Sequence, residues 1–392
     1  MQGLDTNLLL ANRQVNQQTF RPIETNLPMN NLQIQTASQS LYPASQDPAL
    51  KISAEKKSIR KNHSTVSVKS SRKRKSERTI PLIDLSNFSR RRQEISDKLW
   101  DAATNYGFFQ LVNHSIPTKD IDFAFIQASR FFDLKESEKT KFSLRKFKNA
   151  GWESRKQVRS STGLADQKES YQIIQPRMKG LWPQESQLPG FQRQMLTFEH
   201  SCWFLSMQLM SCFAEKLGLE KDHFTHAHNP EQSDYQSTLR LLHYYANSDK
   251  DHKQPTQHPQ QWWAGAHTDY DCLTLLFQRN HQRGLEICCD QTKETQVWSP
   301  VIPDEGLITC NIGDMLMRWS DDKLRSTPHR VAMPKGSEPF DDRHSMAFFC
   351  QANGRQTIYG KQGKYPPISA REFLKQRTAT NSAISSQIAG GI

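Results

Sequence analysis

Residues 265–278 read GAHTDYDCLTLLFQ and place two possible metal ligands directly before a β-strand pattern. His267 and Asp269 are separated by one residue, so on an extended strand their side chains would point to the same side. His329 follows in the stretch Ser326–Val331, where a distant strand could bring a second imidazole to that face. Two imidazoles and one carboxylate on one face of a metal leave other positions open, which is typical of non-haem Fe(II) oxygenases.

The His-x-Asp pattern alone is a weak signal, because three-residue patterns recur by chance and most histidines are structural. Zinc is a competing metal, since it also accepts imidazole and carboxylate ligands. The closely spaced His223, His226 and His228 have no neighbouring acid in a strand context, and we interpret them as structural. The complete triad, in this order and in a β context, favours a catalytic metal site.

A second pair, Arg343 and Ser345, stands two positions apart on a predicted strand, with His344 on the opposite face. A guanidinium group can bind a carboxylate through two parallel hydrogen bonds, and a hydroxyl can add a third. The alternative for this pair is an ordinary surface ion pair at a strand edge. Beside a metal triad, the pair predicts an anchor for a dicarboxylate co-substrate.

The positive charge of the chain is concentrated in residues 1–78. This tail holds 13 Lys and Arg against 5 Asp and Glu, so it carries +8 of the total +12. Its composition predicts a disordered extension, and the cluster Arg72–Lys75 could serve nuclear import or a weak nucleic-acid contact. The rest of the chain carries only +4, so we expect no nucleic-acid partner for the folded part. The sequence has no apolar run long enough to cross a membrane.

Apolar periodicity divides the rest of the chain into three regions: helical at 79–235, β at 236–356, and a C-terminal helix with a flexible end at 357–392. In the first region, helices are expected near 95–106, 120–132 and 191–217, and strands at 80–85 and 108–112. In the last region, Ser369 and Glu372 form a capping box that predicts the start of a helix.

Short apolar segments separated by Gly and Pro predict a sandwich or a double-sheet jelly roll for residues 236–356. The expected strands are 239–245, 272–277, 285–289, 296–300, 307–312, 329–333 and 345–350. The polar stretch 247–261 precedes the His/Asp pair. It is a candidate lid, with a simple surface insertion as the alternative.

Further motifs surround the possible ligands. They read IPLID at 80–84, GFFQLVNH at 107–114, NIGD at 311–314, RWS at 318–320 and STPHRV at 326–331. Together they resemble the 2-oxoglutarate- and Fe(II)-dependent dioxygenases of the isopenicillin N synthase-like family over about residues 79–378. The resemblance implies a mainly β fold with flanking helices, in which N-terminal helices brace a double-stranded β-helix (jelly-roll, cupin-like) core. It also implies Fe(II), 2-oxoglutarate and O₂, with ascorbate as a reductant in vitro.

Within that family the chain is most similar to thymine 7-hydroxylase-like fungal members, through KESY at 168–171, LRLLHY at 239–244 and FFC at 348–350. Two departures set it apart: Tyr245 stands where proline is usual, and Gln351-Ala352 replaces a more usual Asn-Pro. Thymine itself is therefore not carried over as the substrate.

The likeness also implies roles for individual residues. It implies that Tyr244 helps to bind 2-oxoglutarate, together with Arg343 and Ser345. The positions that it assigns to the cavity of the prime substrate are Arg240, Tyr270 and the stretch Phe349–Gln351.

The expected function is oxidation, most simply hydroxylation, of a small organic substrate with release of succinate and CO₂. An oxidative cyclase or desaturase of secondary metabolism would use the same metal centre, and a non-catalytic member of the fold would usually have lost a ligand or the arginine. We expect a monomer with no membrane partner. Seven cysteines without Cys-x-x-Cys spacing indicate reduced thiols. A cytoplasmic location follows, with a nuclear one as the alternative through Arg72–Lys75.

Overall fold

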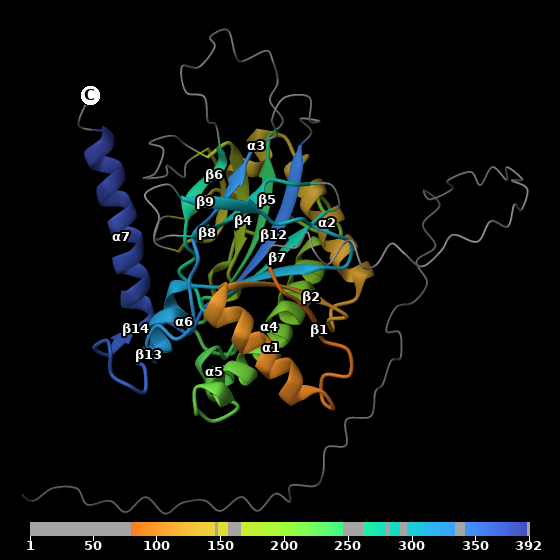
Figure 1. Cartoon of the computed structure of the whole chain (residues 1–392). Coiled ribbons are helices and arrows are strands. Elements are labelled where there is room, and N and C mark those ends of the chain that lie inside the picture. Colours follow the sequence, from red (N-terminus) through yellow and green to blue (C-terminus); the bar gives the residue numbers. More distant parts are fainter. Residues whose placement is uncertain are drawn as a thin grey trace, which may run out of the picture. The chain divides into compact units, whose positions relative to one another are not determined.

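The computed structural model describes residues 80–145, 148–155, 166–245, 262–279, 282–290, 296–333 and 342–389. The predicted tail at 1–78 and the polar stretch at 247–261 lie outside these residues. The described part consists of β-sheets with helices packed around them (Figure 1).

Most strands belong to one eight-stranded sheet. Its strand order is β1-β2-β10-β7-β12-β5-β4-β3, and every pair is antiparallel except β1 and β2. The strands are β1 Leu82–Asp84, β2 Phe108–Val112, β3 Gly151–Ser154, β4 Lys168–Ile173, β5 Thr238–Tyr244, β7 Leu273–Gln278, β10 Ile308–Ile312 and β12 Arg343–Cys350. Strands from before residue 235 thus pair with strands from after it, and the predicted helical and β regions share one sheet.

A second, four-stranded sheet faces the first. Its order is β6-β11-β8-β9, with bounds β6 Trp262–His267, β8 Leu285–Asp290, β9 Val297–Pro300 and β11 His329–Ala332. Side chains from both sheets pack between them, and the rings of Tyr244 on β5 and Trp263 on β6 lie 5.7 Å apart. Two facing, mainly antiparallel sheets confirm the predicted double-sheet arrangement.

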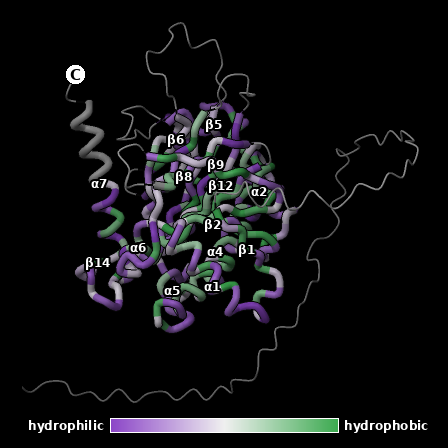
Figure 2. The backbone as a smooth tube through the Cα atoms, viewed as in Figure 1, coloured by the Kyte–Doolittle hydropathy of each residue, from purple (hydrophilic) through white to green (hydrophobic). Residues whose placement is uncertain are grey.

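Three long helices lie near the places predicted for them, and the longest covers the outer face of the large sheet. They are α1 Arg92–Asn105, α2 Thr118–Phe132 and α4 Phe191–Lys216. Helix α4 packs against α1, α2, β7 and β12, and Figure 2 shows hydrophobic stretches along α4 and the neighbouring strands. Phe198 of α4 meets Phe277 of β7 edge to face at 5.0 Å. The shorter helices are α3 Glu136–Lys139, α5 His223–Ala227 and α6 Asp314–Trp319.

The C-terminal part begins with a small hairpin, in which β13 (Thr357–Ile358) pairs with β14 (Ile368–Ser369). Helix α7 (Ala370–Ala389) follows directly. The hydroxyl of Ser369 accepts a hydrogen bond of 3.2 Å from the backbone N–H of Glu372. This bond is the serine half of the predicted capping box, so the predicted helix start is confirmed.

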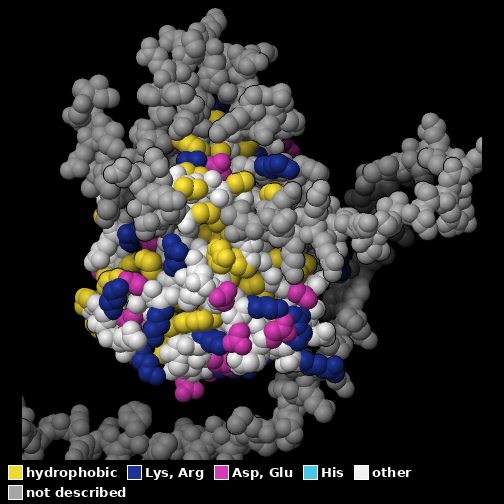
Figure 3. Space-filling model, viewed as in Figure 1, with side chains coloured by type: hydrophobic (Ala, Val, Ile, Leu, Met, Phe, Trp, Pro, Cys, Tyr) yellow, Lys and Arg dark blue, Asp and Glu magenta, His cyan; other side chains and the backbone are white. Residues whose placement is uncertain are grey.

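Charged side chains of both signs lie on the surface of the described part, and most of its thiols are buried. On the face drawn in Figure 3, Lys and Arg side chains are interspersed with Asp and Glu, so this face is not uniformly basic. All seven cysteines are free thiols, and only Cys289 is exposed. Among the described residues, no helix combines the length and the apolar character that crossing a membrane requires.

We expect the stability of the fold to depend on pH because of one buried carboxyl group, that of Glu199. Glu199 of α4 is buried, and it accepts hydrogen bonds of 2.6 Å from the hydroxyl of Tyr235 and from the amide of Gln175. Burial outweighs these two bonds and raises the pKa of Glu199 from 4.5 to about 7. The folded state therefore holds this proton more tightly than the unfolded state does. Its contribution to stability is complete below pH ~4.5 and is lost as the pH rises through about 7.

We expect Glu199→Gln to remove this pH dependence. The amide keeps an acceptor for Tyr235 and cannot ionise, so the variant should exceed wild type in unfolding free energy at pH 8, by up to roughly 3 kcal/mol. Urea unfolding at pH 5 and pH 8 measures the difference. The exposed Glu220→Gln is the matched control. Equal pH slopes for wild type and Glu199→Gln would contradict the argument.

Candidate metal and co-substrate site

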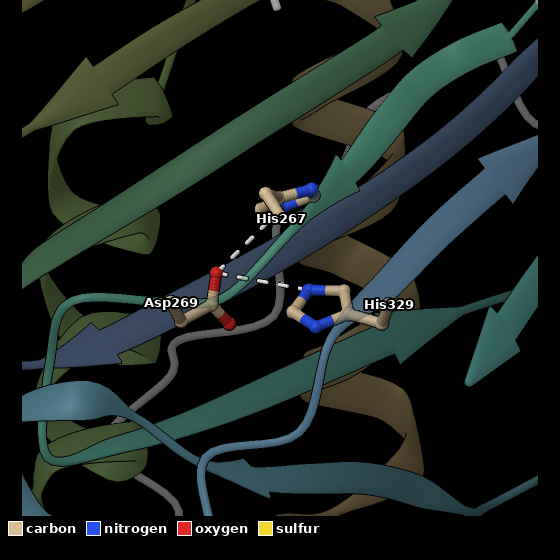
Figure 4. Close-up of side chains that lie close together, drawn as sticks. All are labelled: His267, Asp269 and His329. Carbon is tan, nitrogen blue, oxygen red and sulfur yellow. Dashed lines mark ion pairs between the residues drawn. The ribbon is translucent and has the colours of Figure 1, made fainter. Parts of the chain in front are cut away.

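Three predicted ligands converge between the two sheets. His267 ends β6, His329 begins β11, and the two residues are direct partners in the strand pairing. Asp269 Oδ1 lies 3.8 Å from His267 Nε2 and 3.7 Å from His329 Nε2 (Figure 4). All three possible ligand atoms lie within 4.8 Å of one another. Three donors at these separations can bind one metal ion from the same side.

The structure corrects the reason for this convergence. The prediction placed His267 and Asp269 on one strand, but β6 ends at His267. Asp269 lies in the turn after the strand, and this turn bends its carboxylate back toward the imidazoles (Figure 4). Thr268 does point elsewhere, because its hydroxyl donates a 3.1 Å hydrogen bond to Asp314 Oδ2.

Each histidine is oriented by a backbone carbonyl. His267 Nδ1 lies 2.7 Å from the carbonyl oxygen of Gly265, and His329 Nδ1 lies 3.3 Å from that of Thr327. A carbonyl oxygen can only accept, so each Nδ1 carries the proton and each Nε2 presents its lone pair to the centre. The ring of Phe108 also packs edge-on against His329 at 5.3 Å. Sequence reasoning could not identify these carbonyl partners, because every residue has one.

The carboxylate of Asp269 is fixed through its other oxygen. Oδ2 accepts hydrogen bonds of 2.7 Å from the hydroxyl of Thr274 on β7 and 2.9 Å from the amide of Asn311 on β10. Oδ1 is thereby left facing the two imidazoles. Sequence reasoning placed Thr274 and Asn311 inside quoted motifs but gave them no role.

We expect Thr274→Val to weaken metal binding about tenfold, because losing a group that orients a metal ligand has this order of effect. Valine keeps the shape of the buried side chain and removes only the hydroxyl. Titration with Mn(II) measures the affinity without redox chemistry, and the exposed Thr197→Val is the matched control. Equal Mn(II) affinities in all three proteins would show that Thr274 does not hold the ligand.

The predicted co-substrate anchor lies on the large sheet and is buried. Arg343 and Ser345 of β12 are 2% and 0% exposed, and in the strand pairing they stand opposite Tyr244 and Leu242 of β5. The guanidinium of Arg343 lies 4.6 Å from the ring centre of Tyr244 and 5.9 Å from that of Trp263. Burial opposes ionisation of Tyr244, but the neighbouring positive charges outweigh it and lower the pKa of this phenol.

The anchor has unused hydrogen-bonding capacity. Nε and Nη1 of Arg343 and Oγ of Ser345 are buried and have no hydrogen-bond partner among the described residues. Leaving two N–H groups of a buried cation without acceptors is costly, and a bound carboxylate would supply both the charge and the acceptors. The residues present therefore fit an anionic ligand, in agreement with the predicted dicarboxylate site.

A second cationic residue, Lys168, shares this face of the sheet. Lys168 of β4 stands opposite Tyr244, which in turn stands opposite Arg343, so the three residues form one row across β4, β5 and β12. Lys168 is buried, and its Nζ forms a 2.8 Å ion pair with Asp166. Sequence reasoning quoted Lys168 in a motif without giving it a role. Its place became visible only with the strand pairing.

The predicted substrate residues are only partly brought together. Arg240 of β5 donates a 2.6 Å hydrogen bond to Gln172 of β4, and its guanidinium lies 4.9 Å from the ring centre of Phe349. Arg240 lies four positions before Tyr244 on β5, and an even spacing along a strand places both side chains on the same face of the sheet. Gln351 is held through its backbone, whose N–H donates a 3.1 Å bond to the hydroxyl of Ser237.

Tyr270 directly follows the metal-binding aspartate. A side chain from α7 covers its ring, because the guanidinium of Arg377 lies 5.0 Å from the ring centre of Tyr270. Tyr270 is thus placed by the C-terminal helix, whereas Arg240 is placed by β4 and β12. The triad is also the only group of three such side chains in the described part that could hold a metal, and His223, His226 and His228 do not belong to it.

Two family models match separate parts of the chain. Residues 80–189 match a family described as the non-haem dioxygenase in morphine synthesis N-terminal region, and residues 235–352 match the 2OG-Fe(II) oxygenase superfamily. The chain belongs to the 2OG-Fe(II) oxygenase superfamily. The second match contains the triad and the Arg343/Ser345 pair, whereas the first ends before either.

Relatives of this oxygenase agree with that assignment. It is 34% identical to the proline hydroxylase buaE of Petromyces alliaceus, over 66% of this chain and 82% of the relative. It is 27% identical to the 2-oxoglutarate-dependent dioxygenase tropC of Talaromyces stipitatus, over 76% and 94%. Among solved structures, a full-length Neurospora crassa protein in complex with alpha-KG and thymine is 30% identical, with a TM-score of 0.67 and coverage of 78% and 97%.

These similarities confirm the predicted family, the predicted closeness to thymine 7-hydroxylase-like proteins and the double-stranded β-helix core. The protein is a 2-oxoglutarate- and Fe(II)-dependent oxygenase. Its two sheets remain open at their edges, and helices brace one of them. The alpha-KG in the Neurospora structures is 2-oxoglutarate, the co-substrate predicted here.

Proposed function

We propose that this oxygenase holds Fe(II) through His267, Asp269 and His329. The residues that we assign to the distal carboxylate of 2-oxoglutarate are Arg343, Ser345 and Tyr244. The observation that carries the second assignment is the set of buried, unpartnered donors on Arg343 and Ser345 among the described residues. When bound, the metal and 2-oxoglutarate would supply the reduction of O₂: one oxygen atom enters succinate as CO₂ is released, and the other oxidises a second, small organic substrate.

Each residue has a distinct part in this proposal. The fork of Arg343 binds the distal carboxylate through two parallel hydrogen bonds, and Ser345 adds a third. The ring of Tyr244 packs on the guanidinium and keeps its plane fixed. Trp263, which is 3% exposed, closes the same space from the small sheet and keeps water from the ion pair. An ion pair that is shielded from water is stronger than an exposed one.

For the prime substrate, we propose a small polar molecule and a cavity that Arg240, Tyr270 and Gln351 line. Support comes from the polar lining next to Arg240. Gln172 accepts from Arg240 and also donates to Glu153 at 3.3 Å, and both Gln172 and Glu153 are buried. A lining of this kind favours molecules that offer both donors and acceptors.

Two relatives act on or bind small polar rings. One relative is named a proline hydroxylase, and the Neurospora protein is seen with thymine or with 5-formyluracil. In this chain Tyr245 replaces the usual proline, and its hydroxyl lies 2.8 Å from that of Ser154 on β3. The ring of Tyr245 packs against His243 at 5.2 Å, on the face opposite to Arg240 and Tyr244. Gln351 is therefore the departure that we expect to set a substrate preference different from thymine.

A substrate screen tests the proposal. The full chain is purified without metal, supplied with Fe(II), ascorbate and 2-oxoglutarate, and assayed for succinate by mass spectrometry. We expect slow release without a prime substrate and faster release with the correct member of a panel of pyrimidines, proline-like amino acids and hydrophobic metabolites. A product with one added oxygen indicates hydroxylation, whereas loss of two hydrogens indicates desaturation or ring closure. Absence of succinate under every condition would overturn the proposal.

The same preparation tests the predicted monomer by light scattering after size-exclusion chromatography.

Fusion of residues 1–78 to a fluorescent protein tests whether the basic cluster directs nuclear import. If the fusion stays outside the nucleus, the Arg72–Lys75 cluster has no such role.

A further inference from the structure

One charged side chain of helix α7, that of Arg377, lies against residues 268–270, which form the metal-binding turn. Phe373 of α7 is buried in the core, and Arg377 follows four positions later, so both lie on the same face of the helix. The start of the helix is fixed as well, since the N–H of Arg371 donates to the carbonyl of Gly354 at 3.0 Å. Figure 1 shows α7 rising from β14 near α6. Arg377 therefore points toward the protein from an anchored helix.

Arg377 contacts three residues around the turn. It forms an ion pair with Asp314, the first residue of α6, and donates a 3.4 Å hydrogen bond to the hydroxyl of Thr268. Its guanidinium also lies 5.0 Å from the ring centre of Tyr270. Thr268 and Tyr270 are the two neighbours of the ligand Asp269. Arg377 of the C-terminal helix therefore contacts the residue before and the residue after the ligand Asp269 in the metal-binding turn.

Asp314 connects the same arginine to the ligand itself. Its backbone N–H donates a 2.8 Å hydrogen bond to the carbonyl of Asp269, and its carboxylate accepts one of 3.1 Å from Thr268. The side chain of Asp314 is 7% exposed, so this carboxylate needs a cation close by. Among the described residues, Arg377 is the cation recorded in contact with it. Loss of Arg377 would leave a buried charge directly against the turn.

We propose that Arg377 is a positioning residue of the metal centre. Through Asp314 and Thr268 it fixes the turn that carries the aspartate ligand. Through the face of its guanidinium it fixes the ring of Tyr270, so the C-terminal helix forms part of the active site. This inference rests on the proposed metal site, because it concerns how one of its ligands is held.

Mn(II) titration of the full chain tests the proposal without requiring a prime substrate. We expect Arg377→Ala to weaken Mn(II) binding about tenfold, the lower end of what loss of an outer partner costs. Arg377→Lys should recover part of the affinity, because it keeps the charge opposite Asp314 but loses the fork and the ring contact. The matched control is Lys375→Ala on the same helix, whose side chain is exposed and pairs only weakly with Glu372 at 3.6 Å. Its affinity should stay within twofold of wild type.

A double-mutant cycle and a stability measurement separate positioning from simple anchoring of the helix. Combining Arg377→Ala with Asp314→Asn removes both charges, so the double variant should bind Mn(II) no more weakly than Arg377→Ala alone. If Arg377→Ala and Arg377→Lys lower the melting temperature but bind Mn(II) within twofold of wild type, the proposal is overturned. If wild type itself fails to bind Mn(II), the proposed metal site is wrong, and that result is distinguishable from the first.

Discussion

Asp269→Ala should abolish 2-oxoglutarate turnover, with a loss of succinate formation well beyond 100-fold. Removing a group that merely orients a metal ligand already costs about 10- to 100-fold, and Asp269 is itself a ligand in the proposed site. It also supplies the only negative charge of the triad. Without it, His267 and His329 remain as two neutral donors 4.4 Å apart between ring centres. Two neutral donors hold a divalent ion far less well than three donors with one charge.

The measurement is succinate release at saturating Fe(II) and 2-oxoglutarate, with Mn(II) affinity determined in parallel. Asp269→Asn separates charge from shape, because the amide is almost isosteric with the carboxylate and can still accept one bond from Thr274. It should retain little activity if charge is what the metal needs. The exposed Asp122→Asn on α2 is the matched control and should behave as wild type. Wild-type turnover in Asp269→Ala would remove the basis for the metal assignment.

The sequence could predict the parts of this site that consist of distinctive side chains, but not those that consist of backbone groups. The triad and the Arg343/Ser345 pair were predictable because their residue types are chemically distinctive. Within His267/Asp269 and within Arg343/Ser345 a single residue intervenes, whereas His329 had to come from a distant strand. The carbonyls that orient His267 and His329 were not predictable, since a backbone carbonyl carries no residue identity. The role of Arg377 could not be predicted for another reason. The pattern of polar residues predicts a helix but does not indicate which part of the protein that helix packs against.

The strands show the same division. Short apolar segments predicted nine strands close to their observed bounds, namely β1, β2, β5, β7, β8, β9, β10, β11 and β12. The short strands β3, β13 and β14 were not predicted. Strand β4 was missed because it reads KESYQI and every one of its residues is buried. Lys168, Ser170 and Gln172 lie on the face of Tyr244, whereas Glu169 lies on the opposite face. A strand that buries polar side chains for function breaks the pattern on which strand prediction depends. For β6, only the strand position of His267 was predicted, because the rest of the strand follows directly on a long polar stretch.

Arg343→Met should separate co-substrate binding from metal binding. Methionine fills much of the space against Tyr244 and Trp263 but cannot form the ion pair with a carboxylate. Truncating one partner of a buried charge pair costs about 2–5 kcal/mol, so the KM for 2-oxoglutarate should rise at least about 30-fold, while Mn(II) affinity changes little. Arg343→Lys keeps the charge but loses the bidentate fork, and its KM should lie between those of Met and wild type.

Stability gives this variant a second readout that does not depend on turnover. Nε and Nη1 of Arg343 are buried without a hydrogen-bond partner among the described residues, so losing these two groups should cost the fold little. Ligand that binds only the folded state stabilises wild type by about 2.7 kcal/mol at 100 times its Kd. We therefore expect 2-oxoglutarate with Mn(II) to raise the melting temperature of wild type and of the exposed control Arg193→Met, but not that of Arg343→Met. A normal thermal shift in Arg343→Met, or loss of Mn(II) binding in its place, would show that Arg343 does not anchor the co-substrate.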